Sequence, residues 1–138
     1  QARSSVGWRD LVAVLLGGAV GTSLRLAIDT VIPHPDDAFP LSTLIINTLG
    51  AFALGLLVAR VWPAAPAWLR AGLGAGLLGS FTTFSAVAVS LVSLSAAGEW
   101  MPALAYLAAT LLLGFAAAAL GLRLGTRGRP TDLDLVDE

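Results

Sequence analysis

Cysteine and lysine are both absent from the 138 residues of this chain, and only 12% of the residues are charged. The lack of cysteine excludes a disulfide framework and thiolate ligands for a metal. A net charge of −1 provides no basic surface for nucleic acid, so no nucleic-acid partner is expected. The only histidine, His34, lies in a loop between two prolines. With no residue placed for acid, base or nucleophile chemistry inside the apolar segments, we do not expect an enzyme.

Apolar residues, in contrast, make up 57% of the sequence and give a mean hydropathy of +0.83. Ordinary soluble domains contain about 45–50% apolar residues, so the composition indicates an integral membrane protein. A membrane-spanning helix needs about 20 mostly apolar residues. Four segments meet this requirement and predict an all-α membrane protein with spans over residues 10–32, 41–62, 68–97 and 101–124.

The predicted organisation has three parts, which are a cytoplasmic N-terminal segment (1–9), a four-helix membrane domain (10–124) and a disordered cytoplasmic tail (125–138). The tail mixes charge with glycine and proline, as disordered segments do. The first apolar segment continues to Ile32 without a small-residue cleavage site, so we expect a retained span rather than a removed signal peptide.

Arginine is distributed unevenly around these spans. An even number of spans places both termini on one side of the membrane, and only Arg25 lies toward the other side, together with several acidic residues. The positive-inside rule then predicts a multi-pass protein of the inner (plasma) membrane with both termini in the cytoplasm. The arginines on the cytoplasmic side are Arg3, Arg9, Arg60, Arg70, Arg123, Arg127 and Arg129.

Four helices enclose too little space for a solvated pathway, so we expect the chain to form an oligomer. Glycines in the first three spans offer surfaces on which membrane helices approach closely. Alternatively, glycine is simply common in membrane helices. The glycines concerned are Gly17, Gly18, Gly21, Gly50, Gly55, Gly72, Gly74 and Gly76.

The third span contains the string GLLGSFTTFS at residues 76–85, in which glycines, serines and β-branched threonines make a weak helix. We predict that the helix breaks there. Broken backbone is tolerated at membrane depth only where protein buries it or a ligand binds it. The freed carbonyls and hydroxyls are hard oxygen ligands, which suit a small alkali cation better than a transition metal.

Polar residues also lie in the other three spans. Asn47 interrupts the second span, and Tyr106 and Thr110 lie one turn apart on one face of the fourth. Arg25, in the first span, could extend to the membrane surface or could concentrate anions, and both readings stay open. Uncharged donors beside phenylalanine edges are suited to a small dehydrated anion. The alternative is that these donors only join helices, at about 0.6 kcal/mol per bond.

Four strings together resemble the signature helices of the CrcB/Fluc fluoride channels. They are GGAVGTSLRL (17–26), LSTLIINTLGAFALG (41–55), GLLGSFTTFS (76–85) and AYLAATLLLG (105–114). The resemblance implies a passive, fluoride-specific channel that lowers cytoplasmic fluoride. It also implies an antiparallel dimer with two pores along the subunit interface and a structural sodium ion, Na⁺, at the dimer centre.

The resemblance further implies roles for individual residues. Gly79 and Thr82 would belong to the sodium site. Phe84 would be the first phenylalanine of an aromatic box, and Ser85 would start a polar track that continues on the fourth helix. The implied pore-lining residues are Asn47, Phe84, Ser85, Tyr106, Thr110 and Arg25.

The sequence departs from this family pattern after the third-span motif. Family members commonly read TTFSTFS followed two residues later by a glutamate, whereas this chain has Ala86, Val87 and Ser90 at the threonine, second phenylalanine and glutamate positions. Gly114 stands at a position where the resemblance leads us to expect a further polar residue.

These departures and the arginine bias lead to the hypothesis that the chain has a fixed orientation. It would pair with an oppositely oriented homologue, a heterodimer being favoured over a homodimer, and one of the two pores would be degraded. A non-conducting structural partner subunit of such a heterodimeric channel is the main alternative. A small multidrug antiporter is disfavoured because proton coupling requires a carboxylate within the membrane, away from the span ends.

Overall fold

The computed structural model describes residues 5–35 and 38–127, and all regular structure in this part of the chain is helical. It contains four helical segments long and apolar enough to cross a membrane, as predicted. The predicted tail lies outside the described residues from residue 128 onward, and the fourth span continues slightly further than expected. The spans are α1 (Trp8–Val31), α2 (Leu41–Arg60), the third span (Ala67–Ala96) and α6 (Trp100–Thr126).

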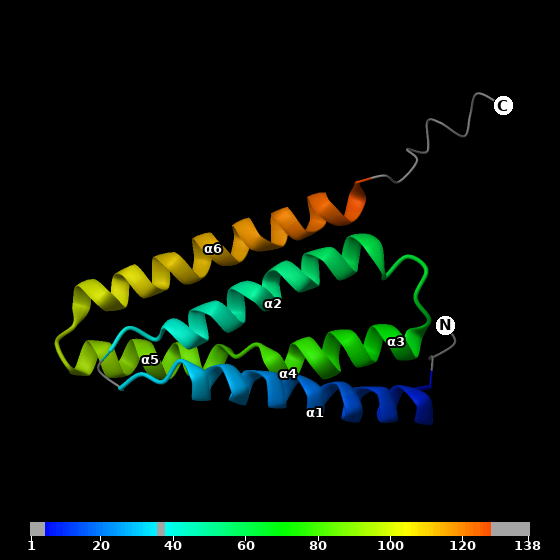
Figure 1. Ribbon diagram of the computed structural model, residues 1–138, viewed down its shortest axis with the longest axis horizontal. Helices are drawn as coiled ribbons and strands as arrows, with labels where there is room; N and C mark the ends of the chain where they lie inside the picture. Colours follow the sequence, from blue (N-terminus) through cyan, green and yellow to red (C-terminus); the bar gives the residue numbers. More distant parts are fainter. Residues whose placement is uncertain (1–4, 36–37, 128–138) are drawn as a thin grey trace.

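The helices form an elongated bundle in which α1 lies along the first half of the third span and α2 lies along α6 (Figure 1). Successive spans run in opposite directions, so the first and last helices bring both ends of the chain to the same end of the bundle. We refer to this as the terminal end of the bundle. The shared position of the termini follows from an even number of spans.

The third span is broken, as predicted from its weak helix formers. A seven-residue π-helix precedes the break, and at the break Thr82 and Thr83 are extended, with ψ angles of 154° and 119°. Both residues are β-branched, which favours extended over helical backbone. The segments of the span are α3 (Ala67–Ala71), η1 (Gly72–Leu78), α4 (Gly79–Phe81) and α5 (Phe84–Ala96).

Glycine sets how closely the helices approach within the chain. A Cβ at Gly17 would overlap the Gly72 carbonyl, and a Cβ at Gly21 would overlap the Leu77 carbonyl, so α1 and η1 touch backbone to backbone. In the same way, a Cβ at Gly55 would overlap a carbonyl of α6. The interpretation of these glycines as surfaces between subunits is therefore wrong, because the chain's own helices occupy them.

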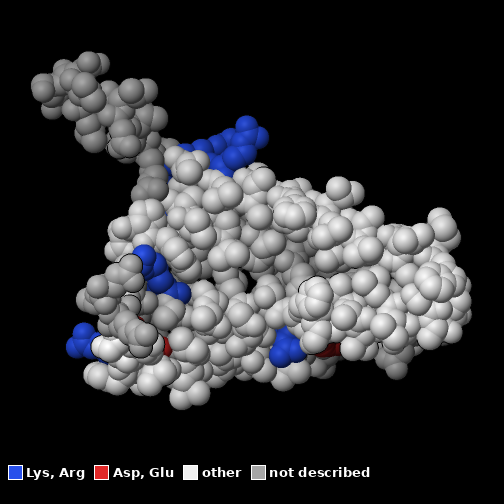
Figure 2. Space-filling model, turned by 180° about the vertical axis from the view of Figure 1, so that it is seen from behind, with Lys and Arg blue, Asp and Glu red and all other residues white. Residues whose placement is uncertain are grey.

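The outer surface of the bundle is mostly apolar, as expected for a protein surrounded by lipid. Figure 2 shows basic side chains gathered mainly at the terminal end, while most of the visible remainder is uncharged. Three of the four tryptophans, Trp8, Trp62 and Trp68, begin or follow helices at this end. Tryptophan is enriched at membrane interfaces, so these residues mark the level at which the terminal end leaves the hydrocarbon.

Candidate functional site

The side chain of Asn47 replaces the helical hydrogen bonds that are lost at the break. Its Nδ2 donates to the Thr83 carbonyl at 3.0 Å, and its Oδ1 accepts from the Thr83 N–H at 2.9 Å. In an unbroken helix that N–H would be donated to the carbonyl of Gly79. One amide on α2 therefore satisfies both backbone groups of Thr83 at mid-span.

Arg25 reaches the same region from α1. Its Nε donates to the carbonyl of Ser80 at 3.0 Å, and the side chain is half-buried. An unbroken helix would instead pair this carbonyl with the N–H of Phe84. Of the two readings left open by the sequence, the contact favours a positive charge held near the break over a side chain directed only to the membrane surface.

The two threonines of the break terminate the helices on either side of it. Thr82 Oγ1 donates to the Leu78 carbonyl at 2.8 Å, one turn back. Thr83 Oγ1 accepts from the Ala86 N–H at 3.2 Å and so caps the N-terminus of α5. Sequence reasoning missed this cap, although a threonine directly before an apolar helical run is an ordinary N-cap signal.

Tyr106 and Thr110 lie inside the bundle on α6. Tyr106 is fully buried, and its ring meets Phe39 edge-on with centroids 5.6 Å apart. Neither the Tyr106 Oη nor the Thr110 Oγ1 has a hydrogen-bond partner among the described residues, although both atoms are buried. Buried polar atoms are nearly always hydrogen-bonded, and these two hydroxyls lie one turn apart on α6, so each is available to the other or to a group from outside the chain.

Phe84 and Ser85 lie apart from these hydroxyls. Phe84 is 85% exposed at the start of α5, and Ser85 is exposed beside it. Val87 is the buried α5 residue in the cluster with Tyr106 and Leu44, and Leu91 of α5 packs against this cluster. The structure thus brings Arg25 and Asn47 to the break and places Phe84 and Ser85 on the outer surface, so the pore roles of all the predicted residues stay predictions.

The backbone beside the break presents oxygens that suit an alkali cation. The Thr83 N–H, which would pair with the Gly79 carbonyl in a helix, goes to Asn47, and the Ala86 N–H, which would pair with the Thr82 carbonyl, goes to Thr83 Oγ1. In the described part of the chain no group of three or more His, Cys, Asp or Glu could hold a metal. Carbonyl oxygens are therefore the available ligands, and they are hard donors.

Two helix termini of opposite partial charge meet at the break. Helix α5 begins at mid-span with its partly positive N-terminus, whereas α4 ends there with partly negative carbonyls. Broken membrane helices use such ends for ions of opposite sign. The same interruption can therefore stabilise an anion on one side and a cation on the other.

Comparison with known proteins identifies relatives of the chain. The family described as "CrcB-like protein, Camphor Resistance (CrcB)" matches residues 12–122, which include the second and third spans with the break and most of the first and fourth spans. The chain is 40% identical over 116 residues to "Fluoride-specific ion channel FluC 2" of Nocardia farcinica, an alignment covering 80% of this chain and 81% of that protein.

Two further relatives share the name "Fluoride-specific ion channel FluC". The protein from Deinococcus radiodurans is 42% identical over 118 residues, covering 81% of this chain and 91% of its own length. The protein from Hydrogenobaculum sp. is 38% identical over 118 residues, covering 84% of this chain and 97% of its own length. With the family match covering most of the membrane bundle, the chain belongs to the CrcB family.

Proposed function

We propose that this chain is a subunit of a fluoride-specific ion channel through which fluoride leaves the cell passively. The observation that carries the proposal is the break at Thr82 and Thr83, whose backbone Asn47 holds open at mid-span. The names of the relatives supply fluoride as the ion. Irregular backbone at this depth is expected only where it is buried in protein or lines an ion or substrate site.

Uncharged hydrogen-bond donors would carry the dehydrated ion. The buried hydroxyls of Tyr106 and Thr110 and the positive end of α5 offer such donors within the membrane. Uncharged donors hold an anion less strongly than a fixed positive charge would, which is in keeping with the weak binding that conduction requires. Arg25, held near the break, raises the local concentration of anions without lying among these hydroxyls.

A structural sodium ion near Gly79 and Thr82 is part of the proposal. Both carbonyls have lost their helical donors, and Gly79 is exposed on the surface of the single chain, where a second subunit could complete the coordination. A bound Na⁺ would supply positive charge that offsets the partial charges of the freed carbonyls. Asn47 and the Thr83 hydroxyl bind the two N–H groups that would otherwise pair with these carbonyl oxygens in a helix.

The partner in this proposal is a homologous subunit in the opposite orientation, a heterodimer being favoured over a homodimer. The exposed Phe84 and Gly79 support a covering subunit, because an aromatic box and a cation site are incomplete on one chain. The basic terminal end supports a fixed orientation with the termini in the cytoplasm of the plasma membrane (Figure 2). Lipid surrounds the remaining apolar surface.

A non-conducting partner subunit is the second candidate function. The packing of Val87 supports this candidate. Val87 is 6% exposed and fills its place against Tyr106 and Leu44, so the smaller side chain is accommodated in a closed core. A phenylalanine at this position would overpack that core in the present arrangement. The pore that uses this face of the chain would then lack one aromatic ring.

Fluoride efflux from liposomes tests both candidates. We expect the chain co-purified with a paired homologue to release fluoride rapidly while retaining chloride, and the chain alone to release little of either. Robust fluoride efflux from the purified single chain would refute the need for a different partner. Equal release of fluoride and chloride from the pair would contradict the proposed selectivity, and no release from the pair would contradict both candidates, because each places the chain in a conducting heterodimer.

Replacing Arg25 tests its electrostatic role. We expect Arg25→Met to lower fluoride efflux of the pair by about tenfold, because the charge that concentrates anions is removed. Raising the ionic strength should shrink this difference, since salt screens the charge. Arg25→Lys should restore part of the efflux, and Arg9→Met, at the terminal end, is the matched control. Efflux from Arg25→Met equal to that of the unmodified pair would refute this role.

A further inference from the structure

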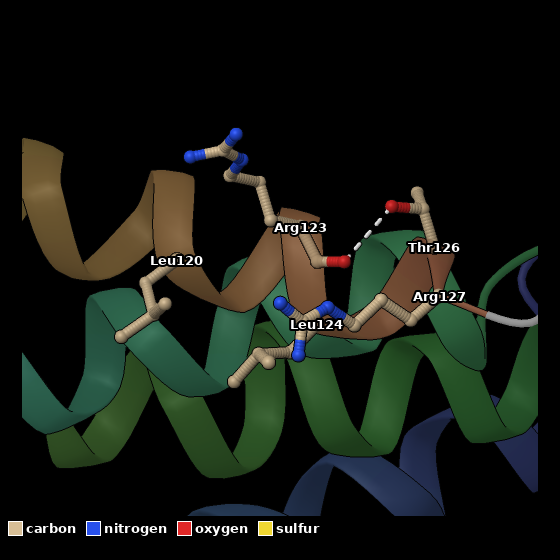
Figure 3. A pocket seen from close by; sticks show the side chains of 5 residues that line it. All are labelled: Leu120, Arg123, Leu124, Thr126 and Arg127. Carbon is tan, nitrogen blue, oxygen red and sulfur yellow. Dashed lines mark hydrogen bonds between the residues drawn. The ribbon is translucent and has the colours of Figure 1, made fainter.

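A groove at the C-terminal end of α6 combines two arginines with two leucines. Its volume is about 340 Å³ and it lies far along the bundle from the break (Figures 1 and 3). Leu120 and Leu124 point the same way from successive turns of the helix, and none of the described residues that line the groove is a carboxylate. The lining residues are Leu120, Arg123, Leu124, Thr126 and Arg127.

The length of α6 places this groove at the level of lipid headgroups. Its 27 residues extend about 40 Å, whereas the hydrocarbon core of a bilayer is about 30 Å thick. With Trp100 at one interface, the hydrocarbon ends near Leu120, and the final turns lie among the headgroups. Trp62, which follows α2 at the same end, is in keeping with this level. Leu120 thus lies where the acyl chains begin, Leu124 lies one turn further out, and the arginines lie at the level of the phosphates.

Hydrogen bonds fix the backbone of this helix end and leave the two guanidinium groups available. Arg60 Nη1 donates to the Arg127 carbonyl at 3.1 Å, and Thr126 Oγ1 donates to the Arg123 carbonyl at 3.0 Å. Among the described residues, neither the Arg123 nor the Arg127 guanidinium has a hydrogen-bond or carboxylate partner. One cation near the C-terminus is enough to stabilise the helix dipole. Dipole stabilisation therefore does not explain why two arginines border a groove.

We propose that this groove binds one anionic phospholipid, with an acyl chain along Leu120 and Leu124 and the phosphate at Arg127, which lies beside Leu124, while Arg123, which points away from the leucines in Figure 3, turns toward the phosphate on binding. Arginine suits this ligand because its planar guanidinium donates two parallel hydrogen bonds to phosphate oxygens. Charge complementarity favours an anionic headgroup over a zwitterionic one, since the described lining carries two arginines and none of its residues is a carboxylate that would pair with a choline. Basic pockets beside membrane helices bind acidic headgroups in this manner.

Native mass spectrometry of the full, delipidated chain tests the proposal, with phosphatidylglycerol and phosphatidylcholine of identical acyl chains as probes. We expect the chain to prefer phosphatidylglycerol, and Arg123→Gln with Arg127→Gln to weaken its binding by about thirtyfold, from two arginine contacts near the surface. The control, Arg9→Gln with Arg70→Gln, removes the same charge at the same end and should weaken binding far less. Arg123→Lys with Arg127→Lys should restore most of the affinity.

Circular dichroism verifies that each variant remains helical before binding is compared. Equal losses in the two glutamine pairs would overturn the proposal, because the preference would then reflect overall charge. Displacement of the lipid by inorganic phosphate at matched concentration would overturn it too, since the site would then take free phosphate. The acidic last residues of the chain (132–138) are a competing occupant. A preference for phosphatidylglycerol that emerges only after residues 128–138 are deleted would assign the groove to them instead.

Discussion

Replacing Asn47 with alanine should abolish fluoride efflux and lower the thermal unfolding temperature of the chain in detergent. The substitution removes the partners of both the Thr83 N–H and the Thr83 carbonyl, which lie at mid-span. Leaving two such groups unpaired costs roughly 2–6 kcal/mol, at about 1–3 kcal/mol for each. Water cannot compensate inside the hydrocarbon, so the break should either rearrange or lose its fixed shape.

Two further variants separate the hydrogen bonds from general effects on α2. Asn47→Asp keeps an acceptor for the Thr83 N–H but, when ionised, has no donor for the Thr83 carbonyl, so its stability should be lower than that of the unmodified chain. Thr48→Ala, at the next residue of α2, should unfold near the unmodified temperature. Unchanged unfolding of Asn47→Ala, measured by circular dichroism, would show that the amide does not support the break.

Gly21→Ala should cause the second large loss, because it separates α1 from the third span. The new Cβ would overlap the Leu77 carbonyl and would lie 3.1 Å from the Phe81 nitrogen, both of which belong to backbone that cannot rotate away. Overpacking of this kind costs about 1–3 kcal/mol, and more where backbone is involved. The shift would also draw Arg25, one turn further along α1, from the Ser80 carbonyl.

Gly114→Ala is the matched control for this variant. A Cβ at Gly114, in the middle of α6, would have nothing within 4 Å in the single chain. Because alanine favours a helix over glycine by about 1 kcal/mol, this control should keep or slightly raise stability. Yields of folded protein and unfolding temperatures in detergent provide the comparison. If both alanine variants behave alike, close approach at Gly21 is not what joins the two helices.

The sequence was sufficient for the spans and for the break. Hydropathy located the four spans to within a few residues, because length and composition alone decide whether a helix can cross a membrane. The break followed from local chemistry, since glycine and paired β-branched threonines weaken a helix whatever surrounds them. Both predictions therefore rest on properties of short segments.

Contacts between residues that are distant in the sequence could not be predicted from the sequence alone. Asn47 was recognised as a polar residue at mid-span, but its bonds to Thr83 depend on how α2 lies beside the third span. The contact of Arg25 with Ser80 joins residues 55 positions apart. The glycines were assigned to contacts between subunits because a sequence pattern shows that a surface is flat but not which helix covers it.

The backbone-level helix contacts have a consequence for biogenesis. Helix α1 packs most tightly on the third span, and α2 on the fourth, so neither close pair consists of consecutive spans. A ribosome releases the spans in order, which leaves α1 waiting for the third and α2 waiting for the last. Until synthesis ends, the surface of α2 around Gly55, which faces α6, is open to lipid or to the insertion machinery. A ribosome stalled before the fourth span should therefore yield a chain that quality-control proteases readily degrade.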